Sequence, residues 1–242
     1  MSSPLRALVT GGSGGIGGAI CRRLAATGHH VLVHANRGVT AAAALVEQIR
    51  SNGGHAETVQ FDVTDAAASG EALARVLDAG TIQVLVNNAG IHEDAVFPGM
   101  SRDQWQRVID VSVNGFYNVT QPLLLPMIRT RFGRIINISS ISALLGNRGQ
   151  VNYAAAKGAL NAATKALSLE VASRGITVNA VAPGIIATHM ANAAFDAASI
   201  ANLVPMKRAG TAEEVASLVG YLASAEAGYI TGQVIAISGG MV

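Results

Sequence analysis

The chain has 242 residues and a net charge of +2, with half of its residues apolar and 13% charged, which excludes a disordered chain. The small net charge and the scarcity of aromatic residues (4%) argue against a nucleic-acid-binding surface. The single cysteine, Cys21, excludes an intrachain disulfide, and no uncharged apolar run reaches the length of a membrane span.

Strand-length apolar runs alternate with helical patterns along the whole chain. Strands are predicted at residues 5–10, 31–34, 58–61, 84–87, 134–139, 177–181 and 233–238. Helices are predicted from about residue 16, at 40–52 and 71–79, from 101 with a break near Pro122 and Pro126, at 152–174, and from 211. Capping boxes at Ser101–Gln104 and Thr211–Glu214 mark two of the helix starts.

This alternation predicts an α/β fold, a doubly wound parallel sheet of about seven strands with helices on both faces. We find no domain boundary, so residues 1–242 are expected to form a single domain. Residues 185–208 show no strong period and are interpreted as a substrate flap. The first ten residues lack the apolar core of a signal peptide, so a soluble cytoplasmic protein without membrane or nucleic-acid partners is expected.

Polar and glycine-rich residues follow the predicted strands. They occupy positions 10–12, 34–37, 62–63, 87–90, 139–140 and 183–184. In open parallel sheets, ligands bind outside the carboxyl ends of the strands. We therefore expect these residues to gather at one edge of the sheet as a binding site.

The turn after the first strand has five glycines within seven residues. It fits G-x-G-x-x-G and also T-G-x-x-x-G-x-G, and both patterns let the backbone approach a pyrophosphate at a helix N-terminus. A plain strand–turn–helix corner, the alternative, needs only one or two glycines. The expected cofactor-binding residues of the loop are Gly11, Ser13, Gly14, Gly15, Ile16 and Gly17.

The end of the second strand favours NADPH over NADH. An NAD site usually carries an acidic residue here for the ribose hydroxyls, and residues 34–37 contain none. Asn36 and Arg37 suit a 2′-phosphate, although Arg37 also fits a solvated loop charge. Asp62 and Val63 are candidates to hold the adenine, by a hydrogen bond and an apolar contact respectively.

Tyr153 and Lys157 are the candidate proton-transfer pair. Residues four apart lie on the same face of a helix, so the ammonium group is expected to lower the pKa of the phenol. Ser140, thirteen residues upstream, could hydrogen-bond the same substrate oxygen. Helix-spaced Tyr and Lys pairs are common, so this interpretation depends on the glycine loop. No metal site is expected.

These motifs in this order, with N-N-A-G at 87–90 and P-G at 183–184, resemble the short-chain dehydrogenase/reductase family along essentially the whole chain. The resemblance implies a single-domain Rossmann fold that transfers hydride between NAD(P) and an alcohol or carbonyl carbon. It makes Tyr153 the general acid, has Lys157 lower its pKa and hold the nicotinamide ribose, and has Ser140 position the carbonyl, with Ser139 as the alternative serine. It also implies a proton relay through Asn114 and cofactor contacts from Asn88, Gly90, Gly184 and Ile186.

Within the family, the stretches at 131–140, 146–160, 173–184 and 237–241 are most similar to the 3-oxoacyl-[acyl-carrier-protein] reductases. This similarity implies reduction of a 3-oxoacyl thioester by NADPH, a homotetramer, and docking of the acidic acyl carrier protein on Arg131 and Arg174. Both arginines also fit ordinary solvated charges. A reductase of a free ketone and a non-catalytic nucleotide-binding subunit are the alternatives. The three histidines at 29, 30 and 34 are expected on the surface.

Overall fold

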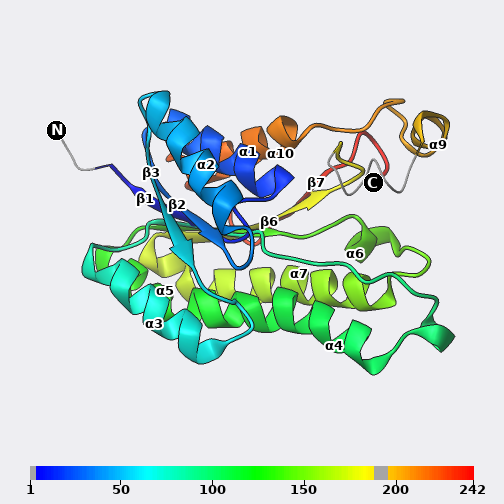
Figure 1. Cartoon of the computed structure of the whole chain (residues 1–242), viewed down its shortest axis with the longest axis horizontal. Coiled ribbons are helices and arrows are strands. Elements are labelled where there is room, and N and C mark those ends of the chain that lie inside the picture. The colour runs from blue at the N-terminus through cyan, green and yellow to red at the C-terminus, as the bar shows by residue number, and fades with distance from the viewer. Residues whose placement is uncertain (1–3, 188–195) are drawn as a thin grey trace.

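Seven parallel strands form the centre of the molecule, as predicted (Figure 1). The computed structural model describes residues 4–187 and 196–242. The strand order is β3-β2-β1-β4-β5-β6-β7, and every neighbouring pair is parallel. The strands are β1 (Arg6–Val9), β2 (His30–Ala35), β3 (His55–Gln60), β4 (Val84–Asn87), β5 (Gly133–Ile138), β6 (Ile176–Pro183) and β7 (Val234–Ile237).

Helices cover both faces of the sheet (Figure 1). One layer consists of α1 (Gly15–Ala26), α2 (Val39–Ser51) and α10 (Ala212–Ala223). The other consists of α3 (Ala66–Asp78), α4 (Arg102–Ile109), α5 (Gly115–Thr130) and α7 (Val151–Val171). Shorter elements are α6 (Ser142–Leu145), α9 (Ala197–Leu203), the 3-10 helices η1 (Phe97–Gly99) and η3 (Ala172–Arg174), and the π-helix η2 (Asp110–Asn114).

Alternation along the central strands divides the interior into two cores. Ala7 and Val9 of β1 face α1 and α10, whereas Leu8 between them faces the α3 and α5 side. Both sides of β1 are therefore buried, which is why its sequence is a continuous apolar run. The doubly wound Rossmann-like architecture is confirmed.

Local capping explains where several helices begin. Both predicted capping boxes are present, Ser101 with Gln104 at α4 and Thr211 with Glu214 at α10. Asp65 caps α3 by accepting a hydrogen bond from the backbone nitrogen of Ala68 at 3.0 Å. Because of this cap, α3 starts five residues earlier than its apolar pattern predicted.

The third strand starts three residues earlier than expected. It occupies the edge of the sheet, and along most of it half-buried residues alternate with exposed ones. An edge strand covered on one face keeps polar residues on the other, so a search for a continuous apolar run detects only its last part.

The predicted break near Pro122 and Pro126 is wrong, because α5 runs through both prolines. Each proline removes an internal hydrogen bond and costs a helix about 3 kcal/mol. Val119, Leu123 and Met127, spaced four apart, are almost completely buried against the sheet. Burial of this stripe outweighs the helix-breaking tendency, which is a tertiary effect.

The expected surface position of the histidines is wrong for His29 and His34, which are both buried. His29 hydrogen-bonds through Nδ1 to the carbonyl oxygen of Leu24 at 3.1 Å. His34 lies inside β2, where the strand passes between the two helix layers. His30 is half-buried.

The predicted flap at 185–208 falls partly on residues 188–195, which lie outside the described residues. Its described end contains α9, which begins after Asp196, whose side chain accepts from the backbone nitrogen of Ser199 at 2.7 Å. Among residues 4–187 and 196–242, no helix combines the length and apolar character that a membrane span requires.

Candidate active site

The turn from β1 to α1 requires glycine at two positions. Gly11 has a φ of +62°, and a Cβ on Gly17 would overlap the carbonyl oxygen of Gly11. The side-chain amide of Asn88 donates to the carbonyl oxygens of Thr10 and Gly11 at 2.9 and 3.1 Å. Asn88 therefore ties the glycine loop to the end of β4, where both elements were expected to meet the cofactor.

The N-terminus of α1 offers free backbone donors. The N-cap residue, Gly14, has no side chain that could cap these donors, and the first turn contains no acidic residue. Gly14 and Gly15 are exposed, and Ile16 is half-buried below them. Uncapped N–H groups at the positive end of a helix dipole attract a phosphate group. The loop thus fits the pyrophosphate of a dinucleotide.

The ends of β2 and β3 meet beside the glycine loop. The amide of Asn36 donates to Asp62 Oδ2 at 2.8 Å, and Arg37 follows on the exposed side. Partial burial acts to raise the pKa of Asp62, but hydrogen bonds from Thr64 and Asn36 and the charge of Arg37 outweigh it and lower that pKa. Asp62 therefore remains ionised and able to accept hydrogen bonds.

Two further predicted contacts lie close to this corner. A Cβ on Gly38 would lie 2.7 Å from the hydroxyl oxygen of Ser13, so the hydroxyl faces the start of α2. Val63 is buried, and a Cβ on Gly115 would lie 2.9 Å from its Cγ2 atom. Val63 thus packs mainly against α5, with little surface left for a ligand.

Ser140, Tyr153 and Lys157 come together beyond the carboxyl end of β5. The Ser140 hydroxyl lies near enough to the Tyr153 phenol to influence its pKa. Lys157 Nζ lies 5.6 Å from the centre of the Tyr153 ring and donates to the carbonyl oxygen of Ile138 at 2.8 Å. The hydroxyl of Ser139 instead donates to the backbone of Lys157 at 3.2 Å. Of the two serines, Ser140 is therefore the one beside the phenol.

Gly90 links this group to the cofactor side. A Cβ at Gly90 would lie 3.1 Å from Lys157 Nζ. A glycine here lets the backbone after β4 pass next to the ammonium group. The predicted residues around the glycine loop and those around Tyr153 are thus neighbours at the same edge of the sheet.

The pKa of Tyr153 shifts in the direction opposite to the one expected. Burial raises the pKa of Tyr153, the polar Ser140 side chain acts to lower it, and the charge of Asp94 raises it further. The Lys157 ammonium points at the carbonyl of Ile138, and burial lowers the pKa of Lys157 to about 8. The expectation that Lys157 lowers the phenol pKa is therefore wrong for this arrangement, which keeps Tyr153 protonated.

Among the described residues, Asn114 makes no side-chain hydrogen bond to the other three expected catalytic residues, although its π-turn η2 packs against α7. Its side chain is exposed and donates to Asp110 Oδ1 at 2.6 Å, within the same π-turn. Ser112, two residues earlier, points inward: it is 2% exposed, and its hydroxyl has no hydrogen-bond partner among the described residues. Sequence reasoning missed Ser112 because the register of a π-turn differs from that of an α-helix.

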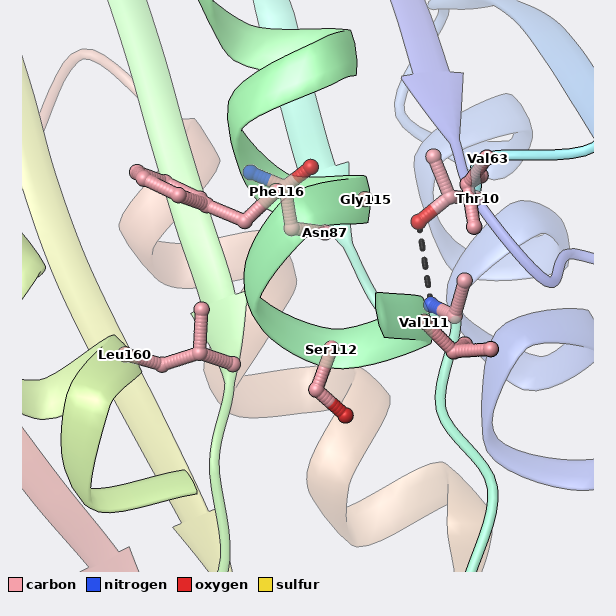
Figure 2. A pocket seen from close by; sticks show the side chains of 9 residues that line it. Thr10, Val63, Asn87, Val111, Ser112, Gly115, Phe116 and Leu160 are labelled. Carbon is pink, nitrogen blue, oxygen red and sulfur yellow. Dashed lines mark hydrogen bonds between the residues drawn. The ribbon is translucent and has the colours of Figure 1, made fainter. Parts of the chain in front are cut away.

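Ser112 borders a small cavity at the carboxyl ends of β1 and β4. The cavity of about 10 Å³ has room for one water molecule, and its lining includes Thr10, Asn87 and Leu160. Figure 2 shows Leu160 of α7 and Thr10 on opposite sides of it. The cavity is too small for a cofactor or a substrate.

Gly184 and Ile186, the expected nicotinamide contacts, differ in exposure. Gly184 is half-buried, and its backbone nitrogen donates to the carbonyl oxygen of Ile237 at 2.9 Å. Ile186 is buried in the α10-side core and pairs with Gly210 through an isolated bridge. Its side chain therefore serves packing, and the half-buried Gly184 is the more accessible of the two.

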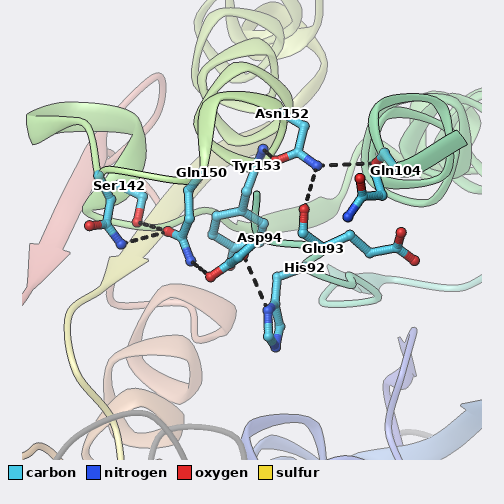
Figure 3. A network of polar contacts seen from close by, with 9 residues as sticks. His92, Glu93, Asp94, Gln104, Ser142, Gln150, Asn152 and Tyr153 are labelled. Atoms are coloured by element: carbon cyan, nitrogen blue, oxygen red, sulfur yellow. Dashed lines mark hydrogen bonds and ion pairs between the residues drawn. The ribbon is translucent and has the colours of Figure 1, made fainter. Parts of the chain in front are cut away.

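A polar network that the sequence did not reveal surrounds the start of α7 (Figure 3). Gln150 accepts from the Ser142 hydroxyl at 3.0 Å and donates to Asp94 Oδ2 at 2.9 Å. His92 lies 3.3 Å from the other oxygen of Asp94. Polar residues in loops have no periodicity that would mark them as neighbours. Gln150 and Asp94 thus hold the loop after β4 beside Tyr153.

Asn152 joins the first turn of α7 to the loop after β4 and to α4 (Figure 3). Its fully buried amide donates to the carbonyl oxygens of Glu93 and Gln104 at 3.0 and 3.1 Å. Its side-chain oxygen accepts from the backbone nitrogen of Tyr153 at 2.8 Å. Asn152 therefore determines where the backbone of Tyr153 lies.

Arg131 and Arg174 are neighbours at the other end of the sheet. Arg131 Nη2 donates to the carbonyl oxygen of Ser173 at 2.9 Å, directly before Arg174. Both arginines are exposed and precede β5 and β6. Tyr153 lies beyond the opposite ends of these strands, and the six residues of β5 alone span about 20 Å.

Within the part of the chain that the structure describes, no three His, Cys, Asp or Glu side chains gather so that they could hold a metal ion. The groups at the sheet edge are instead backbone donors, a phenol, a hydroxyl and an ammonium. Together they can bind a phosphate-bearing cofactor and transfer a proton to a neighbouring oxygen.

Comparison with known proteins gives consistent matches. A family model described as short chain dehydrogenase matches residues 6–199. The chain is 43% identical to the 3-oxoacyl-[acyl-carrier-protein] reductase FabG of Aggregatibacter actinomycetemcomitans, covering 97% of this chain and 98% of that protein. It is 42% identical to nodulation protein G of Azospirillum brasilense, covering 97% of each chain.

A solved structure is similar throughout. It is an Agrobacterium tumefaciens protein provisionally assigned as a gluconate dehydrogenase, with a TM-score of 0.94 and 34% sequence identity. The match covers 98% of this chain and 95% of that one. The same backbone thus occurs in proteins whose names refer to quite different substrates.

Proposed function

The chain belongs to the short-chain dehydrogenase family and is an oxidoreductase acting on CH–OH and C=O groups with a nicotinamide dinucleotide; on this basis we propose that it uses NADPH to reduce the 3-oxo group of an acyl-carrier-protein thioester. The observation that carries the proposal is the meeting of the Ser140 hydroxyl, the Tyr153 phenol and the Lys157 ammonium at the sheet edge that also holds the glycine loop.

Each residue of this group has a step that its position supports. NADPH, when bound, would supply a hydride for the carbonyl carbon. The hydroxyl of Ser140 orients the carbonyl oxygen, and Tyr153 donates its proton to that oxygen. The raised pKa of Tyr153 keeps the phenol protonated until negative charge develops on the substrate. Lys157, with its pKa lowered to about 8, is still largely protonated at pH 7 and lies next to Gly90, where it can bind a ribose hydroxyl.

Apolar side chains beside the site support an acyl substrate. Leu144 and Leu145 are exposed on α6, directly after Ser140, and Phe97 is exposed on η1. The loop before η1 is held to the start of α7 by the bond from the Ala95 nitrogen to the Gly149 carbonyl at 2.9 Å. An acyl chain would cover these apolar groups, whereas a sugar acid would leave them in contact with polar hydroxyls.

Carrier docking on Arg131 and Arg174 is part of the proposal. Reversing both charges (Arg131→Glu with Arg174→Glu) should raise the KM for a carrier-bound 3-oxoacyl thioester roughly tenfold. Attraction of the acidic carrier protein would become repulsion, and exposed charges of this kind have a modest effect on the association rate and affinity. The KM for a short free 3-oxoacyl thioester should not change. The assay is NADPH oxidation followed by absorbance, with Arg75→Glu, an exposed arginine on α3, as the control. Equal effects on both substrates would contradict docking at this pair.

The distance between this pair and Tyr153 bears on assembly. A carrier on Arg131 must deliver its thioester along the length of the strands or into the site of a second copy. We propose a homotetramer, supported by the exposed apolar residues Tyr117 and Leu125 on α5 and Leu169 on α7. Light scattering measures this directly, and a monomer at assay concentration would contradict it.

Preference for NADPH is expected to depend on Arg37. Replacing it with alanine should lower the ratio of kcat/KM for NADPH to that for NADH by about 10- to 100-fold, the equivalent of one charged hydrogen bond of about 1.5–3 kcal/mol. The loss should fall on the KM for NADPH, while NADH is unaffected because it lacks the 2′-phosphate. Arg75→Ala is the matched control. An unchanged ratio would place the phosphate elsewhere.

A reductase of a free polar ketone is the second candidate. It is favoured by the likeness to the provisional gluconate dehydrogenase and by the polar groups of Gln150, Asp94 and His92 near Tyr153. A panel of 3-oxoacyl thioesters and keto-sugar acids at matched concentrations separates the two. Higher kcat/KM on a keto-sugar acid than on every thioester would overturn the acyl proposal.

A further inference from the structure

One buried imidazole touches both sides of the cofactor site. His34, in β2, is 2% exposed. Its Nδ1 atom accepts a hydrogen bond from the backbone nitrogen of Gly11 at 3.0 Å, and its Nε2 atom lies 3.0 Å from the carbonyl oxygen of Phe61. The ring also packs on the Phe61 ring, with centroids 4.2 Å apart.

These partners determine the tautomer of His34. The Gly11 nitrogen can only donate, so Nδ1 must carry a lone pair. The Phe61 carbonyl can only accept, so Nε2 must carry the hydrogen. Burial lowers the pKa of His34 to about 4, which keeps the ring neutral at pH 7 and preserves both bonds.

The two bonded groups belong to different parts of the proposed dinucleotide site. Gly11 is the glycine with positive φ that starts the glycine loop (residues 11–17), here also called the phosphate loop. Its carbonyl oxygen accepts a hydrogen bond from the side-chain amide of Asn88. Phe61 immediately precedes Asp62, which is bonded to Asn36. Asn36, Arg37 and Asp62, at the ends of β2 and β3, form the part of the site expected to hold the adenosine ribose, here called the ribose corner. A shift of either backbone segment would stretch one bond of the imidazole.

We propose that His34 is a positioning residue for the dinucleotide, holding the phosphate loop and the ribose corner at the separation that the adenosine diphosphate part of the cofactor spans. This inference rests on the proposed cofactor site but not on the identity of the substrate. His34 touches neither Tyr153 nor Ser140 through any hydrogen bond among the described residues. Its loss should therefore affect cofactor affinity rather than the chemical step.

Three substitutions separate the two bonds. His34→Leu removes both bonds, His34→Asn keeps an acceptor near Gly11, and His34→Gln keeps a donor toward Phe61. We expect His34→Leu to weaken NADPH binding about tenfold, since the Gly11 N–H would lose its acceptor and the phosphate loop its tie to the strand. Asparagine and glutamine should each restore part of the affinity. At saturating NADPH, kcat and the KM for the oxoacyl thioester should stay within about twofold of wild type.

Fluorescence titration with NADPH and calorimetry with ADP-ribose, which lacks the nicotinamide, supply the measurements. The control is His29→Leu, which removes another buried histidine, whose ring among the described residues hydrogen-bonds only to Thr27 and Leu24. It should lower the melting temperature without changing either affinity. All titrations are run well below the lowest melting temperature.

Parallel weakening of NADPH and ADP-ribose by His34→Leu, with partial rescue, supports the proposal. An unchanged affinity of the folded His34→Leu protein for both ligands would overturn it, as would an effect matched by His29→Leu. Failure of the proposed reaction has another signature: the wild-type protein would bind NADPH but reduce no thioester. The two outcomes are therefore distinguishable.

Discussion

Replacing Tyr153 with phenylalanine is expected to lower kcat by about 10²- to 10⁴-fold, the usual contribution of a positioned general acid. The substitution removes only the phenol hydroxyl, which lies near the Ser140 hydroxyl. The ring keeps its place because Asn152 fixes the backbone of this turn. NADPH oxidation with a saturating oxoacyl thioester measures the loss.

NADPH affinity should survive this change, since the glycine loop and the ribose corner are untouched. Tyr221→Phe, which removes an exposed hydroxyl on α10, is the matched control and should keep full activity. Turnover by Tyr153→Phe at the wild-type rate would rule out Tyr153 as the acid. The non-catalytic nucleotide-binding alternative, which the retained Ser140, Tyr153 and Lys157 disfavour, predicts a different result: the wild-type protein itself would bind NADPH without turning over any substrate.

The second large effect is expected from Gly17→Ala. The added methyl group would overlap the carbonyl oxygen of Gly11 and lie 2.7 Å from the amide nitrogen of Asn88. The carbonyl is backbone and cannot move without opening the phosphate loop. We expect NADPH affinity to fall by about 100-fold or more and stability to fall by about 1–3 kcal/mol, the usual cost of overpacking.

Gly18→Ala provides a control one residue away. Its nearest neighbours would be 3.6 Å from the new methyl group, which is ordinary contact. An alanine inside a helix is favoured over glycine by roughly 0.5–1 kcal/mol, so this variant should melt at a higher temperature and bind NADPH normally. Thermal melts and fluorescence titrations check both. Equal NADPH affinities for Gly17→Ala and Gly18→Ala would contradict the prediction, because they would show that the loop accepts a methyl group at position 17.

Sequence reasoning worked best where the signal is local. The glycine loop could be located because positive φ and close backbone approach require a specific residue type. The capping boxes of α4 and α10 were found because a cap involves residues three apart. The central strands were identified because burial on both faces demands a continuous apolar run.

It failed where a long-range contact decides the outcome. Pro122 and Pro126 favour a break, and only the packing of α5 against the sheet explains the intact helix. His34 looks polar, and only its two backbone partners account for its burial. The inward position of Ser112 was missed because only the π-turn places it there, and the proton relay through Asn114 stays a prediction.

The sequence by itself determined the fold class, the glycine loop and the identity of the residues around Tyr153, because each rests on periodicity or on a residue type with a special backbone property. The spacing to Tyr153 also favoured Ser140 over Ser139, whereas tertiary structure alone decided that the pKa of Tyr153 is raised. It also placed Arg131 and Arg174 at the opposite end of the strands from the site. Distances, burial and direction arise only when separate strands and helices pack together.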